Sequence, residues 1–120
     1  GGLDLDWLTG GLGNDYFIYT NTNEGSDLVG DFSSNAAGNN DVFKFRAITF
    51  GGGLVAGALA ADQFEANTSG VATLATTRFV YDSDDEVLRF DVDGSGAGAA
   101  VTMATLQNGA AFAIGDIIIF

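Results

Sequence analysis

Apolar and polar residues alternate over short stretches of the chain, and Gly, Asp and Ser bound most of these stretches. Residues 42–50 (VFKFRAITF) show the pattern well. Phe43 and Phe45 fall on one face of an extended chain, while Lys44 and Arg46 fall on the other. This spacing predicts a half-buried strand.

The second half of the chain predicts a β-meander. Apolar runs separated by the turn-forming sequences DSDDE and DGSGAGA cover residues 78–81, 87–92 and 100–106. Residues 114–120 form a further apolar, β-branched strand. Residues 54–64 are the only stretch compatible with a helix, and Gly57 weakens it. The pattern therefore predicts an all-β fold with at most one short helix.

A nine-residue repeat opens the chain. Residues 1–9 (GGLDLDWLT) and 10–18 (GGLGNDYFI) agree in identity or character at six of nine places. Gly-Gly comes first, Leu is third, Asp is sixth, an aromatic residue is seventh and a large apolar residue is eighth. Degenerate copies follow at 25–29 and 40–43. Two hairpin turns rich in Gly and Asp are the alternative explanation.

Composition excludes several classes of function. The 120 residues contain no Cys and no His, so thiolate or imidazole metal sites and Ser-His-Asp triads are absent. A net charge of −12 argues against binding nucleic acid or an anionic membrane surface. No apolar run is long enough for membrane insertion. The length allows one small domain, and a hard cation is its natural small partner.

The acidic residues form two clusters. Up to Asp41 the chain has six Asp and one Glu with no Lys or Arg, a formal charge of −7. Residues 82–93 hold six acidic residues and Arg89, a formal charge of −5. A solvated face is the simplest explanation of such clusters. Only the first cluster, however, follows the nine-residue spacing.

The repeats match the nonapeptide G-G-x-G-x-D-x-U-x, in which U is a bulky apolar residue. The chain resembles the C-terminal end of RTX (haemolysin-type calcium-binding) proteins, whose parallel β-helix carries this repeat. The resemblance covers nearly the whole chain. It rests on the order of GGLGNDYFIY, GSDLVGDF, NNDVFKF, LAADQF, RFVYDSDDEVLRFDVDGSGAGAAVTMATL and the terminal GDIIIF.

The resemblance implies a short parallel β-roll over residues 1–46. The roll continues, within one domain, into an antiparallel β-rich cap over residues 47–120. Two nonapeptides make one coil, so each turn faces the second turn after it, with calcium between the two. By this rule Asp6 and Asp27 line one edge. Asp15 lines the other edge, with Asp31 or Asp41 as its partner.

Calcium is therefore the expected cofactor. Stacked carboxylates without a basic partner repel one another, and calcium would supply both charge and ligand bonds, so that binding and folding are linked. In the first turn Asp4 replaces the fourth Gly of the motif. The predicted ligands are the carboxylates of Asp6, Asp15, Asp27, Asp31 and Asp41 and the backbone carbonyls of Gly2, Gly11 and Gly13.

The resemblance implies a non-enzymatic module at the C-terminal end of a larger secreted protein. The type I secretion apparatus of a Gram-negative-type bacterium would export the chain unfolded, and calcium would fold it outside the cell or at the cell surface. Residues 116–120 (DIIIF) fit the shape of the family's C-terminal secretion signal. The chain begins inside the repeat pattern, so we expect an upstream domain of the same polypeptide as a partner.

Two other classes of function remain open at this point. A surface carbohydrate- or adhesion-type binding module could use Trp7, Tyr16 and Tyr19 as a stacking platform, although such residues more often cover neighbouring coils. Carboxylate pairs also occur in glycosidases, but no catalytic acid can be singled out. Residues 91–95 and 82–86 are predicted to be tight turns, with an opportunistic cation site as the alternative for each.

Overall fold

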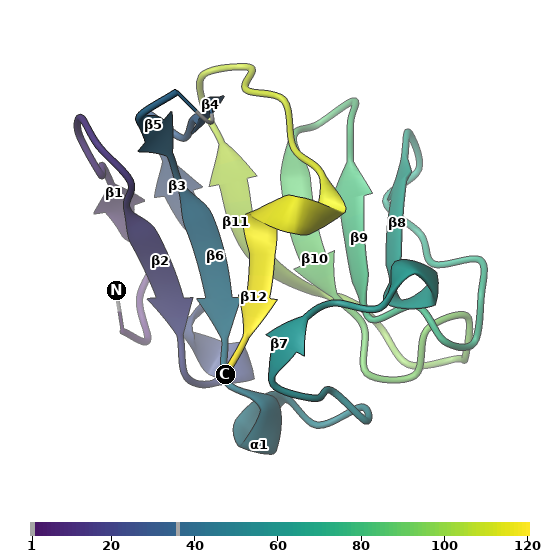
Figure 1. Cartoon of the computed structure of the whole chain (residues 1–120). Coiled ribbons are helices and arrows are strands. Elements are labelled where there is room, and N and C mark those ends of the chain that lie inside the picture. Colours follow the sequence, from purple (N-terminus) through teal and green to yellow (C-terminus); the bar gives the residue numbers. More distant parts are fainter. Residues whose placement is uncertain (1, 36) are drawn as a thin grey trace.

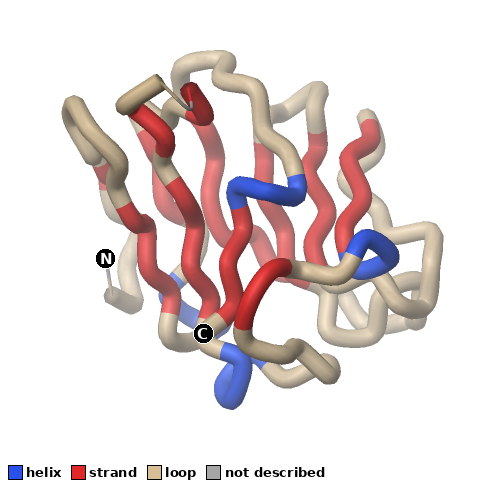
Figure 2. The backbone as a smooth tube through the Cα atoms, in the orientation of Figure 1, coloured by secondary structure: helices blue, strands red, loops and turns tan. Residues whose placement is uncertain are grey.

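Two β-sheets lie face to face and enclose the core, as the ribbon of the computed structural model shows (Figure 1). The structure describes residues 2–35 and 37–120. Strands dominate these residues, and helices are confined to single turns (Figure 2). The predicted all-β class is confirmed at this level.

The larger sheet has six strands in the order β1-β3-β11-β10-β9-β8. Strands β1, β3 and β11 run parallel to one another, and β11, β10 and β9 form an antiparallel meander. Strand β8 lies parallel to β9 at the far edge. The six strands are β1 (Trp7–Leu8), β3 (Asp27–Val29), β8 (Phe64–Asn67), β9 (Phe79–Asp82), β10 (Val87–Phe90) and β11 (Val101–Leu106).

The smaller sheet has four strands in the order β2-β6-β12-β7. Strands β2, β6 and β12 are parallel, and β7 runs antiparallel to β12. These strands are β2 (Tyr16–Tyr19), β6 (Val42–Phe45), β7 (Gly57–Ala58) and β12 (Ile117–Ile119). A two-stranded hairpin, β4 (Ser34–Asn35) and β5 (Asn39–Asn40), projects from the loop before β6.

The chain passes back and forth between the two sheets in its first 45 residues. It enters the larger sheet at β1, the smaller at β2, the larger again at β3 and the smaller again at β6. Trp7 pairs with Leu28 and Tyr16 pairs with Val42. Paired residues of neighbouring parallel strands are thus 21 and 26 residues apart, more than the 18 residues of two nonapeptides. The 3-10 turn η1 (Thr22–Glu24) lengthens the first connection, and the β4–β5 hairpin lengthens the second.

Strands from the second half of the chain extend both parallel stacks. Strand β11 pairs with β3, and β12 pairs with β6. The predicted β-roll segment (1–46) and cap segment (47–120) therefore contribute strands to the same two sheets.

Aromatic side chains fill the space between the sheets. Phe43 and Phe45 are fully buried, as the alternation in residues 42–50 predicts, while Lys44 is half-buried and Arg46 exposed. The rings of Phe43 and Phe17 stack with centroids 5.3 Å apart. The ring of Phe45 packs against that of Phe79 in the larger sheet, with centroids 4.6 Å apart. The first contact joins neighbouring strands of the smaller sheet, and the second joins the two sheets.

Two local predictions are wrong. The strand predicted over 42–50 ends at Phe45, and the α-helix in the described residues is α1 (Ala47–Phe50). Residues 54–64, the only stretch that the sequence left compatible with a helix, instead contain β7, the 3-10 turn η2 (Ala61–Gln63) and the start of β8. The positive φ of Gly51–Gly53 and of Gly57 breaks the helical path, and β12 offers β7 an edge to pair with.

The predicted meander is present, with β10 and β11 shorter than predicted. β9, β10 and β11 fall within one residue of the predicted starts. The predicted terminal strand is divided between a 3-10 turn, η3 (Ile114–Asp116), and β12.

Candidate functional site

The turns that precede the parallel strands stack in two places. We call these the Asp27 edge, where residues 2–6 lie against residues 21–27, and the Asp41 edge, where residues 10–15 lie against residues 31–41. The Asp27 edge precedes β1 and β3, and the Asp41 edge precedes β2 and β6. At both edges backbone N–H groups of the first layer donate to side-chain oxygens of the second, and the second layer returns backbone N–H groups to the carbonyls of Asp6 and Asp15.

Asp27 is fully buried at its edge. Its Oδ1 accepts the N–H of Asp6 at 3.0 Å, and its Oδ2 accepts the hydroxyl of Tyr19 at 2.9 Å. The N–H of Leu28 donates in turn to the carbonyl of Asp6 at 2.8 Å. The predicted pairing of Asp6 with Asp27 is therefore present as a contact between layers.

Asp41 has the equivalent position at the other edge and is also fully buried. Its Oδ1 accepts the N–H of Asp15 at 3.0 Å, and its Oδ2 accepts the N–H of Ser33 at 2.9 Å. Asp31 lies at the same edge, where its two oxygens accept the N–H groups of Gly10 and Gly11 at 2.9 and 2.7 Å. Sequence reasoning left Asp31 and Asp41 as alternative partners of one turn, and the structure brings both of them to it.

Asn39 completes the contacts of this turn, since its Oδ1 accepts the N–H of Gly13 at 2.8 Å. The N–H groups of Gly10, Gly11, Gly13 and Asp15 thus point at the second layer. In a trans peptide the carbonyl points opposite to the N–H, so these peptides turn their carbonyls away from that layer. The carbonyls of Gly11 and Gly13 share their peptides with the N–H groups of Leu12 and Asn14, which are not among these donors. These two carbonyls are therefore not forced to point away from the second layer.

Asp15 has an unusual environment. Its Oδ2 is buried and accepts no hydrogen bond from the residues that the structure describes. The carboxylate lies inside its own turn, because a Cβ added to Gly10 would meet Asp15 Oδ2 at 2.7 Å. A buried carboxylate oxygen without a donor is costly unless a cation compensates it.

Two glycines of the turn, Gly11 and Gly13, are required by backbone conformation and not by lack of space. Gly11 and Gly13 have φ values of 93° and 114°, and a Cβ at either position would meet nothing within 4 Å. Gly2 has the same property in the first turn, with φ of 121°. Residues with side chains rarely adopt such φ values.

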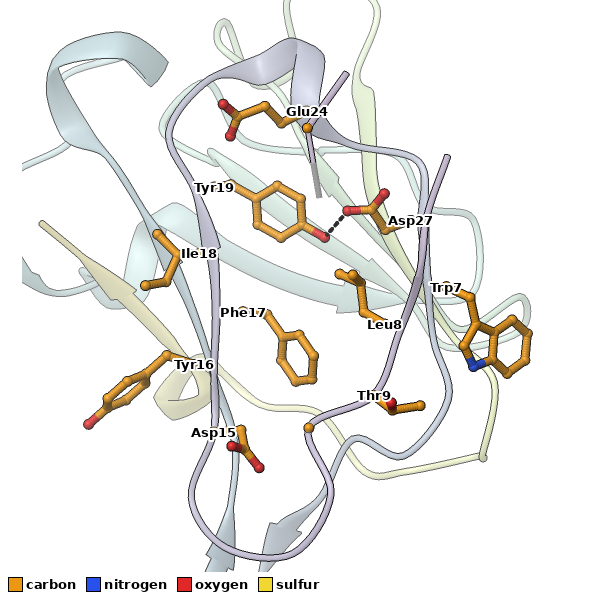
Figure 3. A pocket seen from close by; sticks show the side chains of 12 residues that line it. Trp7, Leu8, Thr9, Asp15, Tyr16, Phe17, Ile18, Tyr19, Glu24 and Asp27 are labelled. Carbon is orange, nitrogen blue, oxygen red and sulfur yellow. Dashed lines mark hydrogen bonds between the residues drawn. The ribbon is translucent and has the colours of Figure 1, made fainter. Parts of the chain in front are cut away.

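A hollow of about 480 Å³ opens between β1 and β2 at the end of the two sheets. Leu8, Phe17 and Tyr19 form its apolar floor, and Asp27 and Asp15 lie at opposite ends of it (Figure 3). The bond from Tyr19 to Asp27 crosses from the smaller sheet to the larger one. Burial, together with the neighbouring Asp27 carboxylate, raises the pKa of the Tyr19 phenol above its usual value, so this hydroxyl stays a donor at ordinary pH.

Sequence reasoning missed the role of Tyr19 and grouped it with Trp7 and Tyr16 as outward-facing residues that cover neighbouring coils or, as the alternative, form a stacking platform. Tyr19 is only 2% exposed, whereas Trp7 and Tyr16 are 62% and 60% exposed on different sheets. The three residues therefore form no common platform. The signal that could have found Tyr19 is the alternation in YFIY, which places Tyr19 on the same inward face as Phe17.

The second acidic cluster forms turns, as predicted. Residues 83–86 and 92–95 are hydrogen-bonded turns. Oδ1 of Asp82 accepts the N–H groups of Asp84 and Asp85, and its Oδ2 forms an ion pair with Arg89 at 3.1 Å. Local donors therefore engage this carboxylate.

Within residues 2–35 and 37–120, no three Asp, Glu, His or Cys side chains gather closely enough to hold a metal by themselves. The carboxylates of Asp27 and Asp41 instead accept the backbone N–H groups of Asp6 and Asp15, and the carboxylate of Asp31 accepts those of Gly10 and Gly11. Any ion at these edges would need backbone carbonyls as further ligands. Calcium accepts such mixed oxygen shells.

Comparisons with protein-family models, with curated proteins and with solved structures gave no match to this chain. None of the helices in the described residues is long and apolar enough to cross a membrane.

Proposed function

We propose that this protein is a calcium-binding module whose parallel strands form a short RTX-type β-roll. The two parallel stacks, β1-β3-β11 and β2-β6-β12, support a coiled path, since the first strands alternate between the sheets. Asp6, Asp15 and Asp41 lie directly before strands of the stacks, and Asp27 is the first residue of β3. This is the arrangement that lets an ion sit between successive turns.

The observation that carries the proposal is the buried Oδ2 of Asp15, which accepts no hydrogen bond within residues 2–35 and 37–120. Its turn contributes the carbonyls of Gly11 and Gly13, and the facing layer contributes Asp41 and Asp31. The other edge offers Asp6, Asp27 and the carbonyl of Gly2. Calcium bound at these edges supplies positive charge to a region with a formal charge of −7 and no Lys or Arg.

Calcium would also control folding. Without the ion, the Asp15 carboxylate is desolvated in the folded state and solvated in the unfolded state, which favours unfolding. Extracellular calcium modules bind at about 10⁻⁴–10⁻³ M, a concentration found outside cells and not in the cytosol. We therefore propose export through a type I secretion apparatus in the unfolded state, followed by calcium-driven folding outside the cell, with a non-enzymatic role beside an upstream domain.

A calorimetric calcium titration of the chelator-treated protein tests this proposal. We expect saturable binding in the millimolar range or tighter, with a matching rise in melting temperature measured by far-UV circular dichroism. Magnesium serves as the control cation, because its strict octahedral geometry and tightly held water suit a mixed carbonyl shell poorly. Identical melting curves in chelator and in calcium at about 10 times the expected dissociation constant of about 10⁻³ M would refute the proposal.

A further inference from the structure

Asp27 and Asp41 occupy equivalent positions but differ in one hydrogen bond. Each accepts the N–H of the Asp one layer earlier at 3.0 Å through its Oδ1. The second oxygen of Asp41 accepts another backbone N–H, that of Ser33. The second oxygen of Asp27 accepts a side-chain hydroxyl, that of Tyr19. The Asp27 edge is thus the one whose geometry depends on a side chain from the opposite sheet.

The Tyr19 ring is held firmly in place. Its centroid lies 5.4 Å from that of Phe45 and 6.2 Å from that of Phe43, with the rings nearly parallel at 14° and 17°. These neighbours are fully buried. The position of the hydroxyl is therefore set by the core, and the hydroxyl in turn sets the rotation of the Asp27 carboxylate (Figure 3).

We propose that Tyr19 is a positioning residue that sets the calcium affinity of the Asp27 edge without affecting the Asp41 edge. The inference rests on the proposed function. A carboxylate has about four lone-pair sites, and the two hydrogen bonds to Asp27 leave the others in a fixed direction. Loss of a partner that orients a ligand typically costs 10–100-fold in metal affinity.

The test is Tyr19→Phe, which removes the hydroxyl and keeps the ring. Tyr81→Phe is the matched control, because Tyr81 is also buried and stacks on Phe112 with centroids 4.8 Å apart. Tyr16→Phe is the exposed control. We expect Tyr19→Phe to weaken one class of calcium sites about 10-fold or more in calorimetry, with the other class unchanged. Neither control should change either class.

A spectroscopic measurement separates positioning from a purely structural role. Calcium binding at Asp27 should perturb the phenol that donates to it, giving a tyrosine difference signal in near-ultraviolet absorbance. We expect this signal in the wild type, in Tyr16→Phe and in Tyr81→Phe, and its loss in Tyr19→Phe. If Tyr19→Phe does not fold, the signal of the two control variants still decides whether Tyr19 responds.

The outcomes distinguish this inference from the proposed function. No calcium binding by the wild type would overturn both. Calcium binding by the wild type with unchanged or tighter binding in Tyr19→Phe overturns the role of Tyr19 alone. An equal loss of calcium affinity at both classes of site in Tyr19→Phe, or a tyrosine signal that survives in this variant, overturns the role of Tyr19 as well.

Discussion

The N–H of Asp15 donates to Oδ1 of Asp41 at 3.0 Å, although 26 residues separate the two along the chain. The second oxygen of Asp41 accepts the N–H of Ser33. One buried carboxylate thus joins two layers of turns and also ties down the start of the loop that carries the β4–β5 hairpin. Neither bond requires calcium, so the contact contributes to the stability of the ion-free fold.

Asp41→Asn should destabilise the ion-free protein by about 1–3 kcal/mol, because an amide nitrogen cannot accept one of the two N–H groups. The free energy of unfolding in urea, measured in chelator, checks this. Asp31→Asn is the matched control. Asp31 also accepts two N–H groups but is only half-buried, so water can replace the lost bond and the cost should be smaller. An Asp31→Asn cost equal to that of Asp41→Asn would contradict the argument.

Asp15→Asn should have opposite effects on the stability of the calcium-free protein and on its stabilisation by calcium. In chelator it removes a buried charge whose Oδ2 accepts no hydrogen bond in the described part of the chain, so the melting temperature should stay the same or rise. In calcium it removes a ligand, so the stabilisation by calcium should shrink. Asp4→Asn, at an exposed position, should change neither value. A lower melting temperature for Asp15→Asn in chelator would show that the carboxylate already has a favourable partner.

Gly13→Ala should destabilise the Asp41 edge through the backbone. Its φ of 114° lies in a region that side chains avoid, and the strain costs about 1–3 kcal/mol. Gly115→Ala is the control, because a Cβ there also meets nothing within 4 Å but its φ is not positive. Urea unfolding of both variants measures the difference. Equal stabilities would mean that the turn relaxes at no cost.

The sequence predicted which Asp residues belong to turns, because the motif places Asp at a fixed position. The sixth-place Asp marks each turn, and Asp6 lies beside Asp27 as expected. The spacing could not predict the length of each coil, since the 3-10 turn and the β4–β5 hairpin are insertions that keep the strands in place. For this reason the choice between Asp31 and Asp41 stayed open until the structure showed both at one turn.

The sequence predicted least where a tertiary contact outweighs local preference. Tyr19 was placed among outward aromatic residues, because an aromatic residue suits either face of a strand. Its burial follows from the stack with Phe43 and Phe45, which come from a strand more than twenty residues later. Likewise β7 forms because it pairs with the edge of β12, and the pattern of residues 54–64 does not predict this pairing.

Asp116 provides a prediction about pH. The carboxyl lies in the turn η3 before β12, is nearly buried, and accepts the N–H of Ala113 through Oδ2 at 2.8 Å. Burial raises the pKa of Asp116 above its ordinary value, although the bond from Ala113 works in the opposite direction. A carboxyl with a raised pKa in the folded state favours folding when protonated. The stabilisation of the folded state by this carboxyl is fully present below the ordinary pKa of about 3.9 and is lost as the pH rises through the folded-state pKa.

Asp116→Asn keeps an acceptor for Ala113 and removes the charge, so it should be more stable than the wild type at pH 7. The advantage should vanish near pH 3, where the wild-type carboxyl is protonated. Thermal unfolding in chelator at the two pH values measures the difference. Asp62→Asn is the control, because Asp62 lies in a similar single turn, η2, but is exposed. A wild type that is the more stable protein at pH 7, or an advantage of Asp116→Asn that persists unchanged at pH 3, would show that burial does not govern this carboxyl.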